Sequence, residues 1–164
     1  MVRTNRRQFG SLALLGAGHL LLCGRSALGY PAPQQKKLNS TLAGVLVGCH
    51  SYSFRDRDLE EALMMMAEVG FGAVELWQDH MEFTHGGREG EAREQLRQWR
   101  LSVPLSEFEV AAALASERRT EFYAYNFAFW DDVTDAEIDR VFEMTKALGA
   151  KVVTGAANPA MVPR

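Results

Sequence analysis

Polar side chains and flat aromatic rings occur together where apolar segments of the sequence end. The set is His50 and Tyr52 at the first segment, Glu75, Trp77 and His80 at the second, and Tyr125 and Asn126 at the third. Ser51, Phe54, Thr154 and Asn158 hold equivalent places. A carbohydrate is bound by both kinds of group, because its hydroxyls need directional hydrogen-bond partners and its C–H face packs on rings. We therefore predict that a small carbohydrate is bound by His50, Tyr52, Glu75, Trp77, His80, Tyr125 and Asn126.

Glu75 is the strongest single candidate, because a carboxylate directly after the apolar Val74 at a strand end seldom serves packing alone. The alternative is a structural ion pair with a neighbouring lysine or arginine. His80 could ligate a metal, but Asn126 rather than a second histidine follows the third segment. We predict no metal ligand and no catalytic residue in this chain.

Strands and helices alternate along the sequence and would bring these residues together. Strands are expected at 44–49, 71–77, 121–126 and 151–155, and helices at 58–70, 93–99, 106–115 and 134–149. The first strand is a continuous apolar run, which is typical of a strand covered on both faces. No glycine-rich phosphate loop follows it, which argues against a Rossmann or P-loop fold. We predict an α/β fold in which residues 44–164 form the first four βα units of a (β/α)8 barrel.

Three of the predicted helices begin with a capping signal. Asp58, Ser106 and Thr134 are each followed three residues later by a glutamate that can complete a capping box. The segment 116–120 before the third strand lacks the glycine that usually ends such a helix. Another residue must then take the left-handed conformation, which lowers the free energy of unfolding by about 1 kcal/mol.

Charge excludes two classes of partner. The chain has 18 basic and 21 acidic residues, and removal of residues 1–29 leaves 14 basic residues and a net charge of −7. Such a surface repels nucleic acid and anionic lipid. Arg93, Arg97 and Arg100 are clustered, but Glu91 and Glu94 share their helix, so we predict a solvated face rather than a phosphate site.

Residues 1–29 are predicted to be an export signal. They contain four arginines and no acid, and the order Asn5-Arg6-Arg7-Gln8-Phe9 resembles the signal of the twin-arginine pathway. The apolar run that follows, about 14 residues, is shorter than the roughly 20 that span a bilayer, and a bulky Leu22 disfavours a lipid anchor at Cys23. We expect cleavage after Gly29, a tether over 30–43, no stable membrane anchor, and a periplasmic or secreted product.

Four segments resemble successive parts of the sugar phosphate isomerase/epimerase family, whose fold is a xylose-isomerase-like TIM barrel. They are Cys-His-Ser-Tyr-Ser-Phe-Arg-Asp at 49–56, Val-Glu-Leu-Trp at 74–77 with His80, Trp-Arg-Leu-Ser-Val-Pro-Leu at 99–105, and Tyr-Ala-Tyr-Asn at 123–126. The resemblance implies an enzyme in which Mn, Mg, Zn or Co grips two substrate oxygens while paired carboxylates move a proton. In the family the metal ligands lie on strands five to eight, so none is carried over and no cofactor is expected in this chain.

The length fits only part of such a barrel. The 135 residues after the export signal compare with about 250 for a closed barrel. We therefore expect the N-terminal portion of an exported isomerase or epimerase. The alternative is a non-catalytic carbohydrate-binding or remnant half-barrel. In either case the first and fourth strands have open edges, which predicts self-association.

Overall fold

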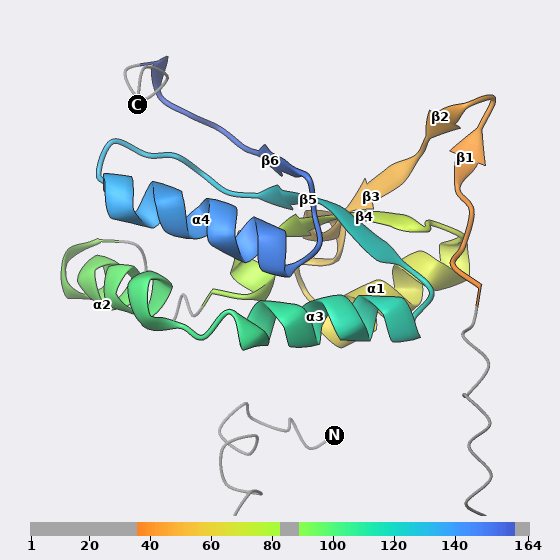
Figure 1. Cartoon of the computed structure of the whole chain (residues 1–164), viewed down its shortest axis with the longest axis horizontal. Helices are drawn as coiled ribbons and strands as arrows, with labels where there is room; N and C mark the ends of the chain where they lie inside the picture. The colour runs from red at the N-terminus through yellow and green to blue at the C-terminus, as the bar shows by residue number, and fades with distance from the viewer. Residues whose placement is uncertain (1–35, 83–88, 160–164) are drawn as a thin grey trace, which may run out of the picture. The chain divides into compact units, whose positions relative to one another are not determined.

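A four-stranded parallel sheet organises the protein. The computed structural model describes residues 36–82 and 89–159, so the predicted export signal lies outside the described residues. The strands are β3 (Gly48–His50), β4 (Ala73–Trp77), β5 (Glu121–Asn126) and β6 (Val152–Thr154), and they follow one another across the sheet in chain order (Figure 1). All three pairings are parallel. The predicted α/β class and its four parallel strands are confirmed, and the described sheet is not closed into a barrel.

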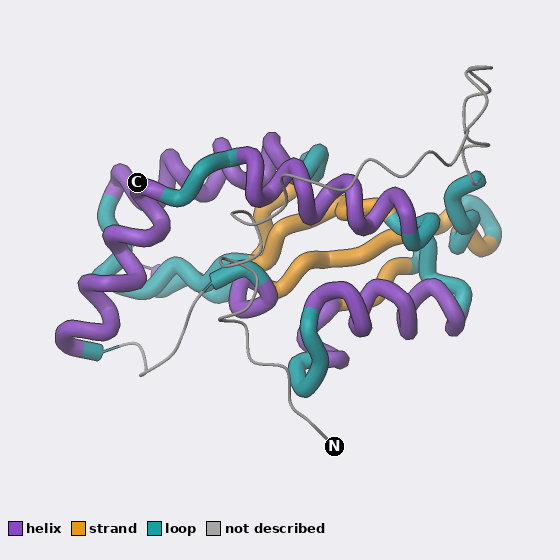
Figure 2. The backbone as a smooth tube through the Cα atoms, turned by 90° about the horizontal axis from the view of Figure 1, so that it is seen from below, coloured by secondary structure: helices purple, strands orange, loops and turns teal. Residues whose placement is uncertain are grey.

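Helices connect the strands and bury one side of the sheet. They are α1 (Leu59–Val69), α2 (Gly90–Ser102), α3 (Ser106–Glu117) and α4 (Asp135–Ala147), with short 3-10 turns η2 (Ser51–Phe54) and η3 (Gln78–His80). In Figure 1, α1, α3 and α4 lie on the same side of the strands, and in Figure 2 the orange strands run alongside these helices. The core is built from Val74, Leu76 and Phe122 of the strands together with apolar helix residues. Alternation along β4 therefore directs Glu75 and Trp77 away from this core.

Two of the three predicted caps are confirmed. The Asp58 carboxylate accepts the Glu61 backbone N–H at 2.9 Å, and Thr134 with Glu137 forms a complete capping box. The prediction for Ser106 was wrong. Ser106 is already the first helical residue of α3, because Leu105 before it has a helical backbone and acts as the N-cap without a side-chain bond.

A hairpin replaces the predicted first strand. β1 (Thr41–Leu42) pairs antiparallel with β2 (Val45–Leu46) across a turn in which Ala43 and Gly44 both have positive φ. Because this turn reverses the chain, only 48–50 reach the sheet, and Val45 and Leu46 are 66% and 52% exposed. The prediction of one strand over 44–49, covered on both faces, was wrong.

The described part of the predicted tether, from residue 36, lies against the fold. The Leu38 N–H donates to the Arg119 carbonyl at 2.8 Å, and Ser40 Oγ accepts the Gly72 N–H at 3.1 Å. A side chain at position 72 would meet the Leu38 carbonyl oxygen at 2.0 Å, so glycine permits this approach. Arg119 takes the left-handed conformation, with φ of 65°, that a glycine would normally hold after such a helix.

Candidate functional site

Three neighbouring strands place polar side chains around the Glu75 carboxylate. Thr154 Oγ1 donates to Glu75 Oε1, and the Asn126 side-chain amide donates to the same oxygen at 3.3 Å. The Tyr123 hydroxyl donates to Glu75 Oε2 at 3.4 Å, a long hydrogen bond. Oε2 therefore keeps a lone pair that a further donor could use.

An irregularity in the sheet explains why Tyr123 joins this group. In the β4–β5 pairing, Val74 lies opposite Phe122 but Glu75 lies opposite Ala124, so Tyr123 is the extra residue of a bulge. Burial, followed by the negative charge of Glu75, raises the pKa of Tyr123, which keeps the phenol protonated as a donor. Sequence reasoning missed Tyr123, because strict alternation back from Asn126 does not place both residues on one face.

Tyr125 does not belong to the site. Its side chain is completely buried in the core on the helix side of the sheet, with its ring centroid 6.1 Å from that of Phe108. The structure therefore separates Tyr125 from the other predicted carbohydrate contacts. The physical reason is that Tyr125 directly precedes Asn126 in β5, and consecutive strand residues point to opposite faces of the sheet.

The aromatic residues of the predicted set form a continuous row beside Glu75. Ring centroids are 5.9 Å apart for His50 and Tyr52, 5.0 Å for Tyr52 and Trp77, and 5.5 Å for Trp77 and His80. Tyr52 is 43% exposed and presents its ring at the surface. The row offers the apolar face that complements the polar cluster at Glu75.

The two histidines of this row are held differently. His80 is buried, with Nδ1 2.9 Å from Ser51 Oγ, which also accepts the Trp77 N–H at 2.8 Å. His50 lies opposite Glu75 in the β3–β4 register. Its Nε2 is buried and has no hydrogen-bond partner among the residues that the structure describes. A ligand hydroxyl at this edge of the sheet could satisfy that nitrogen.

The clustered arginines of α2 form an ion-pair network with Glu82, Asp132 and Glu137, and its centre is buried. Arg100 donates through Nε and Nη2 to both oxygens of Glu82, at 2.7 and 2.8 Å, and through Nη1 to Glu137 Oε1 at 3.1 Å. The side chains of Glu82 and Glu137 are fully buried, and that of Arg100 is 3% exposed. The prediction of a solvated arginine face was wrong, because the partners come from outside the helix.

Arg93 and Arg97 complete this arginine network on the Glu137 side. Arg93 Nη2 lies 3.0 Å from Glu137 Oε1, and its Nε donates to the Asp132 carboxylate. Arg97 Nε donates to Glu137 Oε2 at 3.3 Å. The spacing of four and three residues puts Arg93, Arg97 and Arg100 on one helix face, turned toward the start of α4.

The arginine network also holds the turn that carries His80. The Gln78 side-chain amide donates to Glu82 Oε2 at 3.2 Å, and its carbonyl oxygen accepts the Ala128 N–H at 2.6 Å. The loops after β4 and β5 are thereby fixed to each other, and the arginine network acts as support beneath the site.

Glu137 is strongly acidic. Burial alone would raise its pKa, but hydrogen bonds from the Thr134 backbone and from Arg100, together with the charge of Arg93, outweigh that effect and lower the pKa to about 2. Glu137 is therefore ionised at neutral pH, and its charge stabilises the fold.

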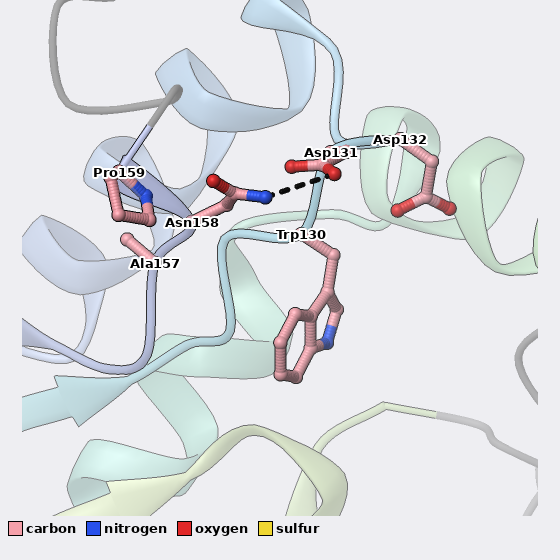
Figure 3. A pocket seen from close by; sticks show the side chains of 6 residues that line it. All are labelled: Trp130, Asp131, Asp132, Ala157, Asn158 and Pro159. Atoms are coloured by element: carbon pink, nitrogen blue, oxygen red, sulfur yellow. Dashed lines mark hydrogen bonds between the residues drawn. The ribbon is translucent and has the colours of Figure 1, made fainter.

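A hollow of about 570 Å³ lies between the loops that follow β5 and β6 (Figure 3). Its lining residues are Trp130, Asp131, Asp132, Ala157, Asn158 and Pro159. The Asn158 amide donates to Asp131 at 3.0 Å and joins the two loops, while Trp130 is 51% exposed. The hollow adds a second mixture of ring and polar groups at the carboxyl end of the sheet.

The described residues do not form a divalent-metal site. Within 36–82 and 89–159, no three His, Cys, Asp or Glu side chains are grouped as ligands. The side chains that bond Glu75 are neutral donors, which suits a carboxylate anion rather than a shared cation.

Comparison with known proteins adds no relative. The chain matches no protein-family model, no curated protein and no solved structure. None of the helices described is long and apolar enough to cross a membrane.

Proposed function

We propose that the face of the sheet opposite the helices binds a small carbohydrate or sugar-like acid. The observation that carries this proposal is the Glu75 carboxylate, which is oriented by donors from β5 and β6 and flanked by the aromatic row from His50 to His80. Directional oxygens beside flat rings suit hydroxyls and C–H faces together. The predicted contacts that support it are His50, Tyr52, Glu75, Trp77, His80 and Asn126, to which we add Tyr123 and Thr154.

The wider proposal is that this four-stranded parallel sheet with its connecting helices forms the substrate-side wall of a (β/α)8 barrel of the isomerase/epimerase type. The parallel strands in chain order, with helices on one side, support it. The alternative is a non-catalytic carbohydrate-binding half-barrel. This alternative is favoured by the three neutral donors around Glu75, which hold the carboxylate as an acceptor.

Carbohydrate binding is tested by substituting the central carboxylate. In ligand-observed NMR on the 164-residue chain with a panel of aldoses and ketoses, we expect Glu75→Gln to weaken binding by about tenfold or more, because a charge-assisted hydrogen bond is lost. Glu121→Gln is the matched control, since Glu121 begins β5 at the opposite end of the sheet and is exposed. It should leave binding unchanged.

One outcome tests the location of the site, and another separates the isomerase from the non-catalytic alternative. If the unsubstituted chain binds no sugar of the panel, or if both substitutions act equally, the site is misplaced. If the chain binds a sugar but does not interconvert it with its isomer in the presence of Mn²⁺, the non-catalytic alternative is favoured. Circular dichroism melting of each variant separates lost binding from lost folding.

We also propose that the protein leaves the cytoplasm by the twin-arginine pathway. Arg6→Lys combined with Arg7→Lys should trap the precursor in the cytoplasm, because the receptor reads the guanidinium pair and not charge alone. Arg3→Lys, outside the pair, is the control and should be exported normally. Cell fractionation measures the distribution, and unchanged periplasmic delivery of the double variant would contradict the proposal.

A further inference from the structure

The negative charge of Glu75 is not neutralised within the part of the chain that the structure describes. Its three hydrogen-bond partners, Tyr123, Asn126 and Thr154, are all neutral side chains. By contrast, the buried carboxylate of Glu137 pairs with three arginines. A partly buried carboxylate without a cation leaves a local negative potential, which attracts a positively charged ligand.

His50 does not supply the missing cation. His50 and Glu75 are partners in the β3–β4 register, and partners on neighbouring parallel strands point to the same face of the sheet. No hydrogen bond or ion pair joins their side chains, and His50 Nε2 has no partner among the described residues. The charge of Glu75 therefore remains available to a ligand.

Aromatic rings lie beside this carboxylate. Trp77 follows Glu75 by two residues in β4 and therefore lies on the same face of the sheet. The ring of Tyr52, which is 43% exposed, meets the ring of Trp77 edge-on with the centroids 5.0 Å apart. The face of an aromatic ring is electronegative, so it attracts a cation and repels an anion. The rings and the carboxylate thus favour the same sign of ligand charge.

A second carboxylate without a cation lies at the same end of the sheet. The pairing of β5 and β6 continues past both strands, since the Phe129 N–H donates to the Ala156 carbonyl at 2.8 Å. Just beyond, Asp131 lines the hollow of Figure 3 and accepts the Asn158 amide, but it forms no ion pair with any described residue. The exposed Trp130 ring lines the same hollow. Carboxylates next to rings therefore recur along this edge, and their potentials add.

We propose that the ligand of the Glu75 site is an amino sugar, which binds through its protonated amine. The inference rests on the proposed carbohydrate function and narrows it to one class of sugar. Glu75 Oε2 receives the ammonium, because its hydrogen bond from Tyr123 is long at 3.4 Å. A hydrogen bond between an ammonium and a carboxylate is roughly twice as strong as one between neutral groups. A neutral sugar leaves the charge of Glu75 unpaired, and a sugar acid adds a second anion beside it.

Arg55 is a cation beside the aromatic row and could instead favour an anionic sugar. The central carbon of its guanidinium lies 4.7 Å from the centroid of the Tyr52 ring. Arg55 is exposed, whereas Glu75 is partly buried, so water and salt screen the charge of the arginine more strongly. An anionic sugar would depend on Arg55, and an amino sugar depends on Glu75. Substitution of each residue therefore separates the two classes of ligand.

Isothermal titration of the 164-residue chain, slightly below neutral pH, tests the proposal. The ligands are glucosamine, galactosamine and mannosamine, each compared with its parent hexose, its N-acetyl derivative and the matching hexonic acid. We expect at least one amine to bind about tenfold or more tightly than its three counterparts, because only the amine is positively charged. The N-acetyl derivatives keep the nitrogen and remove its charge.

Two substitutions locate the source of this preference. Glu75→Gln should reduce the ratio of the hexose and amine dissociation constants to about twofold or less, because the amide carries no charge. Arg55→Gln is the control and should leave this ratio unchanged, since Arg55 contacts the Tyr52 ring and not Glu75. Circular dichroism melting checks the fold of both variants, and the comparison of ligands on the unsubstituted chain does not depend on either variant.

The outcomes separate this inference from the proposed function. A hexose, an N-acetyl derivative or a hexonic acid that binds as tightly as its amine would overturn the amino-sugar inference and leave carbohydrate binding standing. A preference for the amine that persists in Glu75→Gln would place the ammonium elsewhere and would overturn it too. If no sugar of the series binds, the proposed function fails and the inference fails with it.

Discussion

Replacing Arg100 with methionine will lower the free energy of unfolding by about 3 to 5 kcal/mol, the largest effect we expect from a single substitution. Methionine fills much of the arginine volume but removes the cation that bonds both oxygens of the fully buried Glu82 carboxylate, and it removes one of the three arginines that pair with the fully buried Glu137. A buried carboxylate that loses its arginine is costly because the protein interior solvates the charge poorly. Urea unfolding followed by far-ultraviolet circular dichroism measures the change.

The control is an ion pair of the same chemistry at the surface. Arg118 pairs with Glu60, and their side chains are 37% and 57% exposed. Water screens this pair, so Arg118→Met should cost less than about 1 kcal/mol. Equal losses for the two variants would show that the arginine network does not depend on burial.

Glu137→Gln will make the protein less stable at neutral pH and less sensitive to acid. The pKa of Glu137 is lowered from 4.5 to about 2 in the folded protein, which corresponds to about 3 kcal/mol of stability. Because the folded pKa is the lower one, this contribution is fully present above about pH 5 and is lost as the pH falls toward 2. Unfolding free energies across that window should fall less steeply for the variant.

Glu143→Gln on the same helix provides the comparison. Glu143 is exposed and bonds Arg140 at 2.5 Å, so its substitution should change the unfolding free energy by less than about 1 kcal/mol. An unchanged acid profile for Glu137→Gln would contradict the assignment of acid sensitivity to the arginine network.

Local chemistry in the sequence predicted the order and type of most elements. The Asp58 and Thr134 caps bond backbone groups three residues away, and Gly70 ends α1 in the left-handed conformation. Because these interactions are local, the sequence alone is enough to predict them. Four strands in chain order follow from the short turns between helix and strand. These features needed no knowledge of distant contacts.

Features that depend on distant residues could not be predicted in this way. The arginines of α2 look neutralised within their own helix, yet their partners Glu82 and Glu137 lie 18 and 37 residues from Arg100. Tyr123 and Asn126 both reach Glu75 because of the bulge in the β4–β5 pairing, and a bulge arises from the pairing of two strands. The hairpin over 41–46 likewise turns an apolar run away from the sheet.

The arginine network also restricts which substitutions can accumulate at its positions during evolution. Arg100 bonds both Glu82 and Glu137, and Glu137 also caps α4 and pairs with Arg93. Replacing one member alone therefore removes a charged partner from a buried side chain of another. Joint replacement by apolar residues of similar volume removes that penalty, since a buried ionic triad is often no more stable than a well-packed apolar one. Substitutions at these positions should therefore be inherited in groups, with strong non-additivity between them. Among descendants of this sequence, the fully charged and the fully apolar versions should both occur, and the half-exchanged versions should be rare.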